Sequence, residues 1–137
     1  MKCPKCESKR NIKAVPIDYD YSRKCGIDGC TITASEYTCK ACGFKFIDLG
    51  DHLEINNTIA EVLISAPMLT RQMIKFIRIH YFDESPFQFA KRCHMNPTVY
   101  KEIEDYHRPM SQVCSDVIQE QLVKKMIEKP DLKIVFD

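Results

Sequence analysis

The sequence predicts an α+β protein in which a small β-rich N-terminal domain with one helix precedes an all-α domain. Three observations support this fold class. The first 50 residues are rich in β-branched and tyrosine side chains, and apolar residues recur at helical spacing from position 53. From position 70 onward, helix-capping residues and prolines recur at short intervals, which is typical of short helices joined by tight turns. The 137 residues are enough for two small domains.

The N-terminal domain is expected to contain a β-hairpin followed by a helix. Segments 12–21 and 31–38 have the composition of strands, and the Gly-Ile-Asp-Gly sequence at 26–29 lies between them as a turn. A helix is expected at 53–66, because its apolar residues follow a helical period until Pro67 interrupts the pattern.

The all-α domain is expected to span residues 68–137, and the N-terminal domain residues 1–67. Thr70, Ser85 and Asn96 carry side chains that are preferred at helix N-caps, and a proline directly follows the second and the third of them. Short connections force neighbouring helices to pack at steep angles, as they do in a helix-turn-helix. The expected helices are 70–81, 87–93, 98–106 and 111–128.

Eight cysteines are the one unusual feature of the composition. Cys3 and Cys6 form one Cys-x-x-Cys pair, and Cys39 and Cys42 form a second after 32 intervening residues. A tight turn at each pair points two thiolates at one ion, and a hairpin can bring both pairs together into a tetrahedral site. Soft thiolates in this geometry favour Zn²⁺, with iron as the usual alternative. We therefore expect these four cysteines to hold one zinc ion per chain, in a structural site without an open position for catalysis.

The other four cysteines do not form a second convincing metal site. Cys25 and Cys30 flank the expected turn. Three alternatives are open for them: two reduced strand residues, a disulfide, or a two-ligand metal contact. A reducing cytosol favours the first of these alternatives. Cys93 and Cys114 fall on apolar helical faces and are expected in the core.

Charge and motif content exclude several classes of protein. Lys and Arg total 20 against 19 Asp and Glu, so the chain lacks the excess positive charge of a strongly basic nucleic-acid-binding protein. The sequence contains no glycine-rich phosphate-binding loop and no clustered acid and base, so no enzymatic activity is expected. It also has no N-terminal apolar signal segment and no apolar stretch long enough to span a bilayer, so we expect a cytoplasmic protein.

Residues 85–109 have the pattern of two helices joined by a turn. Ala90 provides the small side chain that close approach of the second helix requires, and Tyr100 and Ile103 form the apolar face of that helix. This stretch resembles the Cro/repressor-type (XRE, lambda repressor-like) helix-turn-helix, whose closing segment is matched by Ile-Glu-Asp and His-Arg-Pro. The sequences Met-Lys-Cys-Pro-Lys-Cys and Cys-Lys-Ala-Cys-Gly-Phe resemble the zinc module of MqsA/YgiT-type antitoxins. Both resemblances point to that one antitoxin family and together cover nearly the whole chain.

The resemblance implies a transcriptional repressor of the type II antitoxin kind. It implies a homodimer that binds palindromic operator DNA through the C-terminal domains, while the zinc domain binds a partner toxin. Two alternatives remain open. One is a stand-alone regulator of a phage or mobile element without a toxin, and the other is a zinc-ribbon adaptor whose helical domain binds only protein.

The resemblance also implies which residues contact DNA. Family members contact bases from the start of the second helix, and the matching positions here are Thr98 and Glu102, with Val99 and Lys101 on the same outward face. A carboxylate at position 102 can accept a hydrogen bond from cytosine N4. Positive side chains near the helix ends are expected to contact phosphates. They are Arg71, Lys75, Arg78, Lys91, Arg92, Lys101 and Arg108.

The last helix carries more apolar surface than one small core can bury, so a dimer seam is expected along it. Its apolar residues are Val113, Val117, Ile118, Leu122, Val123, Met126 and Ile127.

Overall fold

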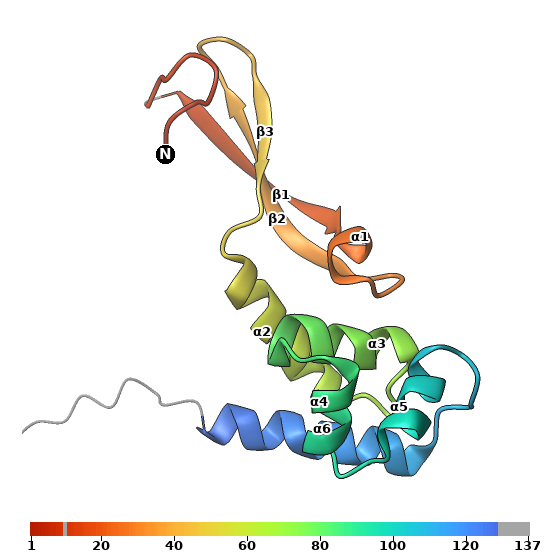
Figure 1. Cartoon of the computed structure of the whole chain (residues 1–137). Coiled ribbons are helices and arrows are strands. Elements are labelled where there is room, and N and C mark those ends of the chain that lie inside the picture. The colour runs from red at the N-terminus through yellow and green to blue at the C-terminus, as the bar shows by residue number, and fades with distance from the viewer. Residues whose placement is uncertain (10, 129–137) are drawn as a thin grey trace, which may run out of the picture. The chain divides into compact units, whose positions relative to one another are not determined.

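Three antiparallel strands form the sheet of the N-terminal unit in the order β1-β2-β3 (Figure 1). The structure is a computed structural model that describes residues 1–9 and 11–128. β1 (Ile12–Asp20) and β2 (Thr31–Cys39) pair along their whole length, with Ile12 opposite Cys39, and β3 (Lys45–Asp48) pairs with the second half of β2. The expected hairpin is confirmed, and so is the α+β fold class.

The connection between β1 and β2 differs from the four-residue turn that the sequence suggests. β1 ends at Asp20, whose carboxylate accepts a hydrogen bond from the Ser22 N–H at 3.0 Å and so begins a short helix, α1 (Ser22–Cys25). Gly26 ends that helix with a φ of 78°, a left-handed conformation that glycine adopts without a steric penalty. The hairpin therefore carries a helical turn at its tip.

The hydrophobic core of the N-terminal unit is small. Most side chains of β1 are exposed. The buried side chains of this unit are Cys3, Tyr21, Cys25, Ile27, Ala34 and Cys39. Because so little apolar surface is removed from water, this unit needs a further source of stability.

The chain divides into two compact units, Met1–Ile55 and the remainder from Asn56 onward. The division falls inside α2 (His52–Ile64), whereas the sequence pattern places a boundary after residue 67. The end of α2 belongs to the second unit for a physical reason. Gln119 Nε2 donates to the carbonyl oxygens of Leu63 and Ala66 at 3.0 and 2.8 Å, which satisfies acceptors that a helix end leaves unpaired.

The second unit consists of short helices whose starts the capping residues predict correctly. Ser85 Oγ accepts from the Gln88 N–H at 3.2 Å, and Asn96 Oδ1 accepts from the Thr98 N–H at 2.9 Å. The Thr70 side chain caps the helix that begins at Arg71 in the same way. After α2, the helical elements are α3 (Arg71–Phe76), the π-helical η1 (Ile77–Phe82) that continues it, α4 (Pro86–Arg92), α5 (Pro97–Glu104) and α6 (Gln112–Glu128).

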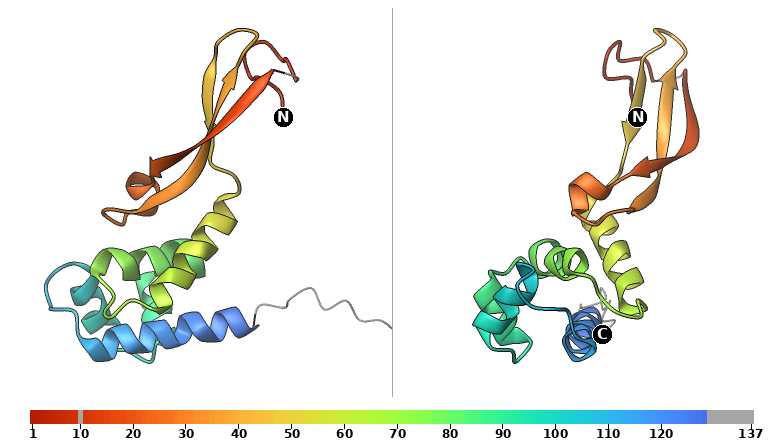
Figure 2. Two further views of the ribbon diagram at one scale, coloured as in Figure 1. Left: turned by 180° about the vertical axis from the view of Figure 1, so that it is seen from behind. Right: turned by 90° about the vertical axis from the view of Figure 1, so that its right-hand side faces the viewer.

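The core of the second unit is dense and aromatic. Phe89 lies between Phe82 and Tyr100, with ring centroids 5.4 and 5.5 Å away. Ala90 is fully buried on α4, as the helix-turn-helix pattern requires, and α4 packs against α5 (Figure 2). Cys93 and Cys114 are buried in this core, which confirms their expected role.

A buried ion pair joins η1 to α5. Arg78 donates from Nε and Nη2 to the two carboxylate oxygens of Glu104 at 3.0 and 2.5 Å, and from Nη1 to the Glu84 carbonyl at 3.0 Å. Both side chains are almost completely buried. The expectation that Arg78 contacts DNA phosphates is therefore wrong, because its guanidinium lies inside the fold.

The pair also sets the protonation of Glu104. Burial alone raises the pKa of a carboxyl group, but the hydrogen bonds from Arg78 and its positive charge outweigh burial and hold the pKa of Glu104 below its usual value. Glu104 is therefore a carboxylate at neutral pH. This charge-assisted, two-bond contact fixes the position of α5 against η1.

Candidate metal centre and helix-turn-helix surface

Two backbone turns present the four cysteines of the N-terminal unit. In the first turn the Glu7 N–H donates to the Cys3 carbonyl at 2.9 Å. In the second, after β2, the Gly43 N–H donates to the Cys39 carbonyl at 2.7 Å, and Gly43 has a left-handed φ of 76°. The pairing of β1 with β2 brings the two turns to the same end of the sheet, because Ile12 lies opposite Cys39.

The four thiol groups form one cluster. All four sulfur atoms lie within 4.8 Å of one another, with Cys3 Sγ 3.6 Å from Cys42 Sγ and Cys6 Sγ 3.5 Å from Cys39 Sγ. Four sulfurs at a Zn–S distance of about 2.3 Å around a tetrahedral ion are about 3.8 Å apart. The observed spacing fits that arrangement, so the four cysteines are positioned to bind one metal ion, as the sequence predicts.

The protonation of the cluster suits cation binding. Burial raises the pKa of Cys3, but hydrogen bonds from the Cys6 and Lys5 amides outweigh it and lower the pKa to about 6. At Cys6 the Ser8 amide lowers the pKa, but the neighbouring thiols and burial raise it to about 12. The thiols therefore cannot all ionise by themselves. A bound cation compensates their charge and displaces the remaining protons.

Cys25 and Cys30 lie outside this cluster. Cys25 is buried at the end of α1 and Cys30 immediately precedes β2, so neither is a strand residue, contrary to the favoured expectation. Both are free thiols in the structure. Burial and the neighbouring Cys25 raise the pKa of Cys30 to about 12, which keeps it protonated at neutral pH.

The first surface of interest in the second unit is a groove between the starts of α4 and α5, which we call the α4–α5 groove. Its volume is about 580 Å³. It brings together Thr98, Lys101 and Glu102, three of the residues expected to contact DNA. The lining residues are Ser85, Pro86, Phe87, Pro97, Thr98, Lys101, Glu102, Asp105 and His107.

Charged residues of this surface are paired with one another. Lys101 Nζ lies 3.3 Å from Asp105 Oδ1, and Arg108 Nη2 lies 2.8 Å from Glu102 Oε2. Val99, also expected to contact DNA, is half-buried on α5. The groove wall near α4 is apolar, because Phe87 is 63% exposed there.

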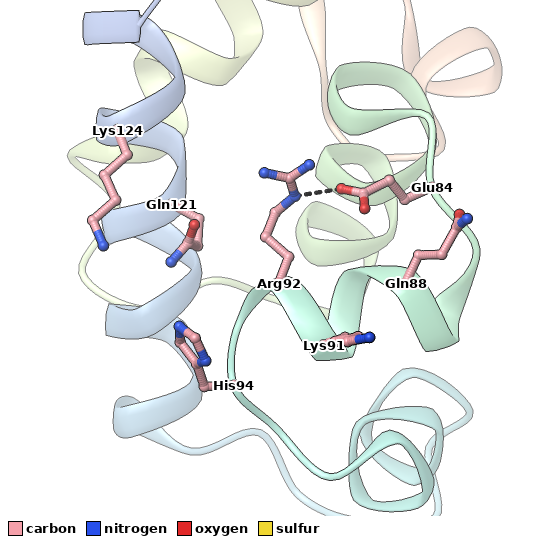
Figure 3. A pocket seen from close by; sticks show the side chains of 7 residues that line it. All are labelled: Glu84, Gln88, Lys91, Arg92, His94, Gln121 and Lys124. Carbon is pink, nitrogen blue, oxygen red and sulfur yellow. Dashed lines mark hydrogen bonds and ion pairs between the residues drawn. The ribbon is translucent and has the colours of Figure 1, made fainter.

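Lys91 and Arg92, which are also expected to contact DNA phosphates, do not line the α4–α5 groove. They line a second groove of about 490 Å³, the α4–α6 groove, which shares no lining residue with the α4–α5 groove (Figure 3). Its lining residues are Glu84, Gln88, Lys91, Arg92, His94, Gln121 and Lys124. The structure thus places the expected DNA-contacting residues on two different surfaces.

Arg71 has a structural role that the sequence does not predict. Its Nε donates to the Ile103 carbonyl and its Nη2 to the Arg108 carbonyl, both at 2.8 Å, and its guanidinium lies 4.5 Å from the Tyr106 ring centroid. Tyr106 has a left-handed φ of 68°, which costs energy for a bulky residue. Arg71 therefore holds the segment after α5, and only the fold reveals these partners.

Comparison of the chain with protein-family models, with curated proteins and with solved structures finds no match. Within the described part of the chain, no helix combines the length and the apolar character needed to cross a bilayer.

Proposed function

We propose that this protein is a zinc-stabilised transcriptional repressor of the type II antitoxin kind that binds palindromic operator DNA as a homodimer. The observation that carries this proposal is the arrangement of α4 and α5. The two helices are joined by a tight turn at 93–96, and α5 is held from behind by the Arg78–Glu104 pair while Thr98 and Lys101 stay exposed. This is the arrangement in which a second helix enters the major groove.

Zinc is the metal that the cluster suits best. Four cysteine ligands in tetrahedral spacing are typical of structural zinc sites, and the spacing of this cluster suits the tetrahedral coordination of Zn²⁺. Four protein ligands leave no open position for a substrate or water. We therefore assign the ion a structural role and propose no catalytic activity.

The ion pairs of the α4–α5 groove suggest how contacts change on binding. In the free protein Glu102 neutralises Arg108 across 2.8 Å. On DNA, Glu102 accepts a hydrogen bond from cytosine N4, and Arg108 is released to a backbone phosphate. Because net charge is only +1, binding to nonspecific DNA is expected to be weak, and a specific complex needs both half-sites of a palindrome.

Substitutions on α5 test this proposal. Thr98→Ala and Lys101→Ala are each expected to weaken binding to a preferred duplex by about 1–3 kcal/mol and to broaden the sequence preference, because they remove contacts to bases. Glu102→Gln is expected to change the preference at one base pair. Preferred duplexes are selected from a random pool, and affinity is measured by fluorescence anisotropy at several salt concentrations.

Lys13→Ala is the matched control, since Lys13 is exposed on β1 in the other unit. It should leave the affinity unchanged. The proposed DNA contacts would be refuted if no duplex were recovered from the pool. They would also be refuted if all three α5 variants bound DNA with the affinity and sequence preference of the wild-type protein.

The dimer seam proposed on α6 is narrower than its apolar sequence suggests. Ile118 and Leu122 are fully buried in the core of the same unit. Val113, Val123 and Ile127 remain exposed, and their spacing places them on one side of the helix. This exposed stripe supports a self-complementary contact between two copies.

Full-length protein is expected to sediment as a dimer at micromolar concentration, and Ile127→Glu should shift it toward monomer, because a buried unpaired charge opposes association. Val62→Glu is the matched control, because Val62 is equally apolar and 68% exposed but lies on α2. Sedimentation velocity distinguishes the species. A wild-type monomer at this concentration would contradict the seam.

A second candidate function is a zinc-ribbon adaptor that binds only protein. The exposed Phe87, flanked by Pro86 and Pro97 in a groove whose charges are internally paired, favours it. The two candidates differ in a single measurement. An adaptor shows no salt-dependent binding to any duplex, whereas a repressor does.

The N-terminal unit is proposed to bind a small toxin protein. The support for this role is the resemblance of its Cys-x-x-Cys sequences to the antitoxin zinc module. Co-expression with the product of the adjacent open reading frame tests it. A stable complex supports the antitoxin function, and a lone DNA-binding protein supports a stand-alone regulator of a phage or mobile element.

A further inference from the structure

We propose that the α4–α6 groove is a binding site for an acidic peptide segment of a partner protein, with Arg92 as the anchor for a carboxylate. The groove lies between the end of α4 and the middle of α6 (Figure 3). Because it shares no lining residue with the α4–α5 groove, this inference does not depend on the proposed binding of DNA.

Arg92 is held ready for a ligand by two neighbours. Its guanidinium carbon lies 4.6 Å from the centroid of the buried Phe82 ring, and its Nε donates to the carboxylate of Glu84. Among the described residues, the two terminal nitrogens have no hydrogen-bond partner, and Figure 3 draws a contact to Glu84 from Nε alone. A guanidinium with this free edge matches a carboxylate through two parallel hydrogen bonds, and little rotamer entropy is lost on binding.

The groove also carries positive charge beyond Arg92. Lys91 on α4 has no ion pair among the described residues, and Lys124 on α6 has only an exposed pair with Glu120 at 3.4 Å. Exposed pairs four residues apart on a helix contribute only about 0.3–0.5 kcal/mol, so Lys124 can turn to a ligand at little cost. The lining therefore has three cations and a single carboxylate, Glu84, which is already bonded to Arg92.

His94 lines the groove in a left-handed backbone conformation. Its φ is 55°, and a left-handed residue with a side chain costs about 1–2 kcal/mol relative to the common conformations. Glycine would avoid this cost at the end of α4. The sequence instead places an imidazole there, which can donate a hydrogen bond to a ligand in the groove.

The mixture of groups favours a peptide over a nucleic-acid backbone. Gln88 and Gln121 present side-chain amides that both donate and accept, and these match the N–H and C=O groups of a peptide. A phosphate backbone offers only acceptors and a dense negative charge, so the carbonyl oxygens of these two amides would find no donor there. A segment with spaced carboxylates satisfies both the cations and the amides.

The experiment uses the full-length, metal-loaded protein and a fluorescein-labelled peptide of alternating glutamate and alanine. Fluorescence anisotropy is expected to show saturable binding that weakens as salt rises. Arg92→Gln should weaken it about tenfold, the effect of losing a charge-assisted hydrogen-bonded pair. Lys75→Gln, an exposed lysine on α3 outside the groove, is the matched control and should leave the affinity within about twofold.

With the wild-type protein, any of three results would overturn the proposal: no saturable binding, equal binding of the peptide with glutamine in place of glutamate, or displacement of the bound peptide by a short DNA duplex. The last result would assign the groove to nucleic acid. Since Arg92 also packs on Phe82, thermal unfolding is measured for each variant. The surface double variant Lys91→Gln/Lys124→Gln repeats the test without touching the core, and its unchanged affinity would equally refute the site.

Discussion

Cys39→Ser is expected to empty the metal site and to unfold the N-terminal unit while the second unit stays folded. A structural zinc ion contributes on the order of 10 kcal/mol of apparent binding free energy, and that free energy is coupled to folding. The N-terminal unit has few buried apolar side chains with which to compensate. The second unit has its own dense core around Phe89 and Tyr100. Metal content by mass spectrometry, together with hydrogen exchange of segments 12–39 and 74–104, measures both effects.

Cys30→Ser is the matched control for this experiment. Cys30 belongs to the same unit and is half-buried, but it is not one of the four clustered cysteines. The control should keep one metal ion per chain and the protection of the sheet. A normal metal content in the Cys39 variant would contradict the ligand assignment, and unfolding of both units together would contradict their independence.

Glu104→Gln is expected to destabilise the second unit by about 3–5 kcal/mol. The substitution keeps the shape of the side chain but leaves the buried Arg78 guanidinium without its countercharge, and removal of one partner of a buried ion pair has this typical cost. Urea unfolding followed by circular dichroism measures the change. Asp105→Asn is the control, because its pair with Lys101 is exposed and should contribute less than about 1 kcal/mol.

The same pair predicts how stability depends on pH. The folded-state pKa of Glu104 lies below its unfolded value of about 4.3, so the stabilisation is fully present above that value. It is lost progressively as pH falls through the folded-state pKa. The wild-type protein should therefore lose its advantage over Glu104→Gln on acidification, with the two unfolding free energies converging. A difference that stays constant from pH 6 to pH 3 would show that the carboxylate charge does not stabilise the unit.

Two elements of the N-terminal unit could not be predicted from the sequence for a common reason. β3 has only four residues, too few for an alternating pattern, and it is a strand because it pairs with β2. That pairing stacks Phe46 on Tyr37, with ring centroids 5.3 Å apart. α1 is equally short, and it begins where the Asp20 carboxylate accepts a local hydrogen bond from the Ser22 N–H, rather than at a periodic signal. Elements of this length depend on their neighbours rather than on propensity.

The helix starts of the second unit and the four-cysteine site can be read from short stretches of sequence. Caps such as Ser85 and Asn96 act on amides two or three residues away, and each Cys-x-x-Cys pair positions two thiols within a single turn. Such signals are contained in a few consecutive residues, so they survive without knowledge of the fold.

Which charged and apolar side chains share a surface depends on tertiary packing. Arg78 was expected to contact DNA phosphates but is buried against Glu104. Arg92 lies in a groove that contains none of the α5 residues expected to contact DNA bases. On α6, tertiary packing places Leu122 in the core while Ile127 remains exposed. These outcomes depend on the angles at which helices far apart in the sequence pack together, and one-dimensional periodicity carries no information about those angles.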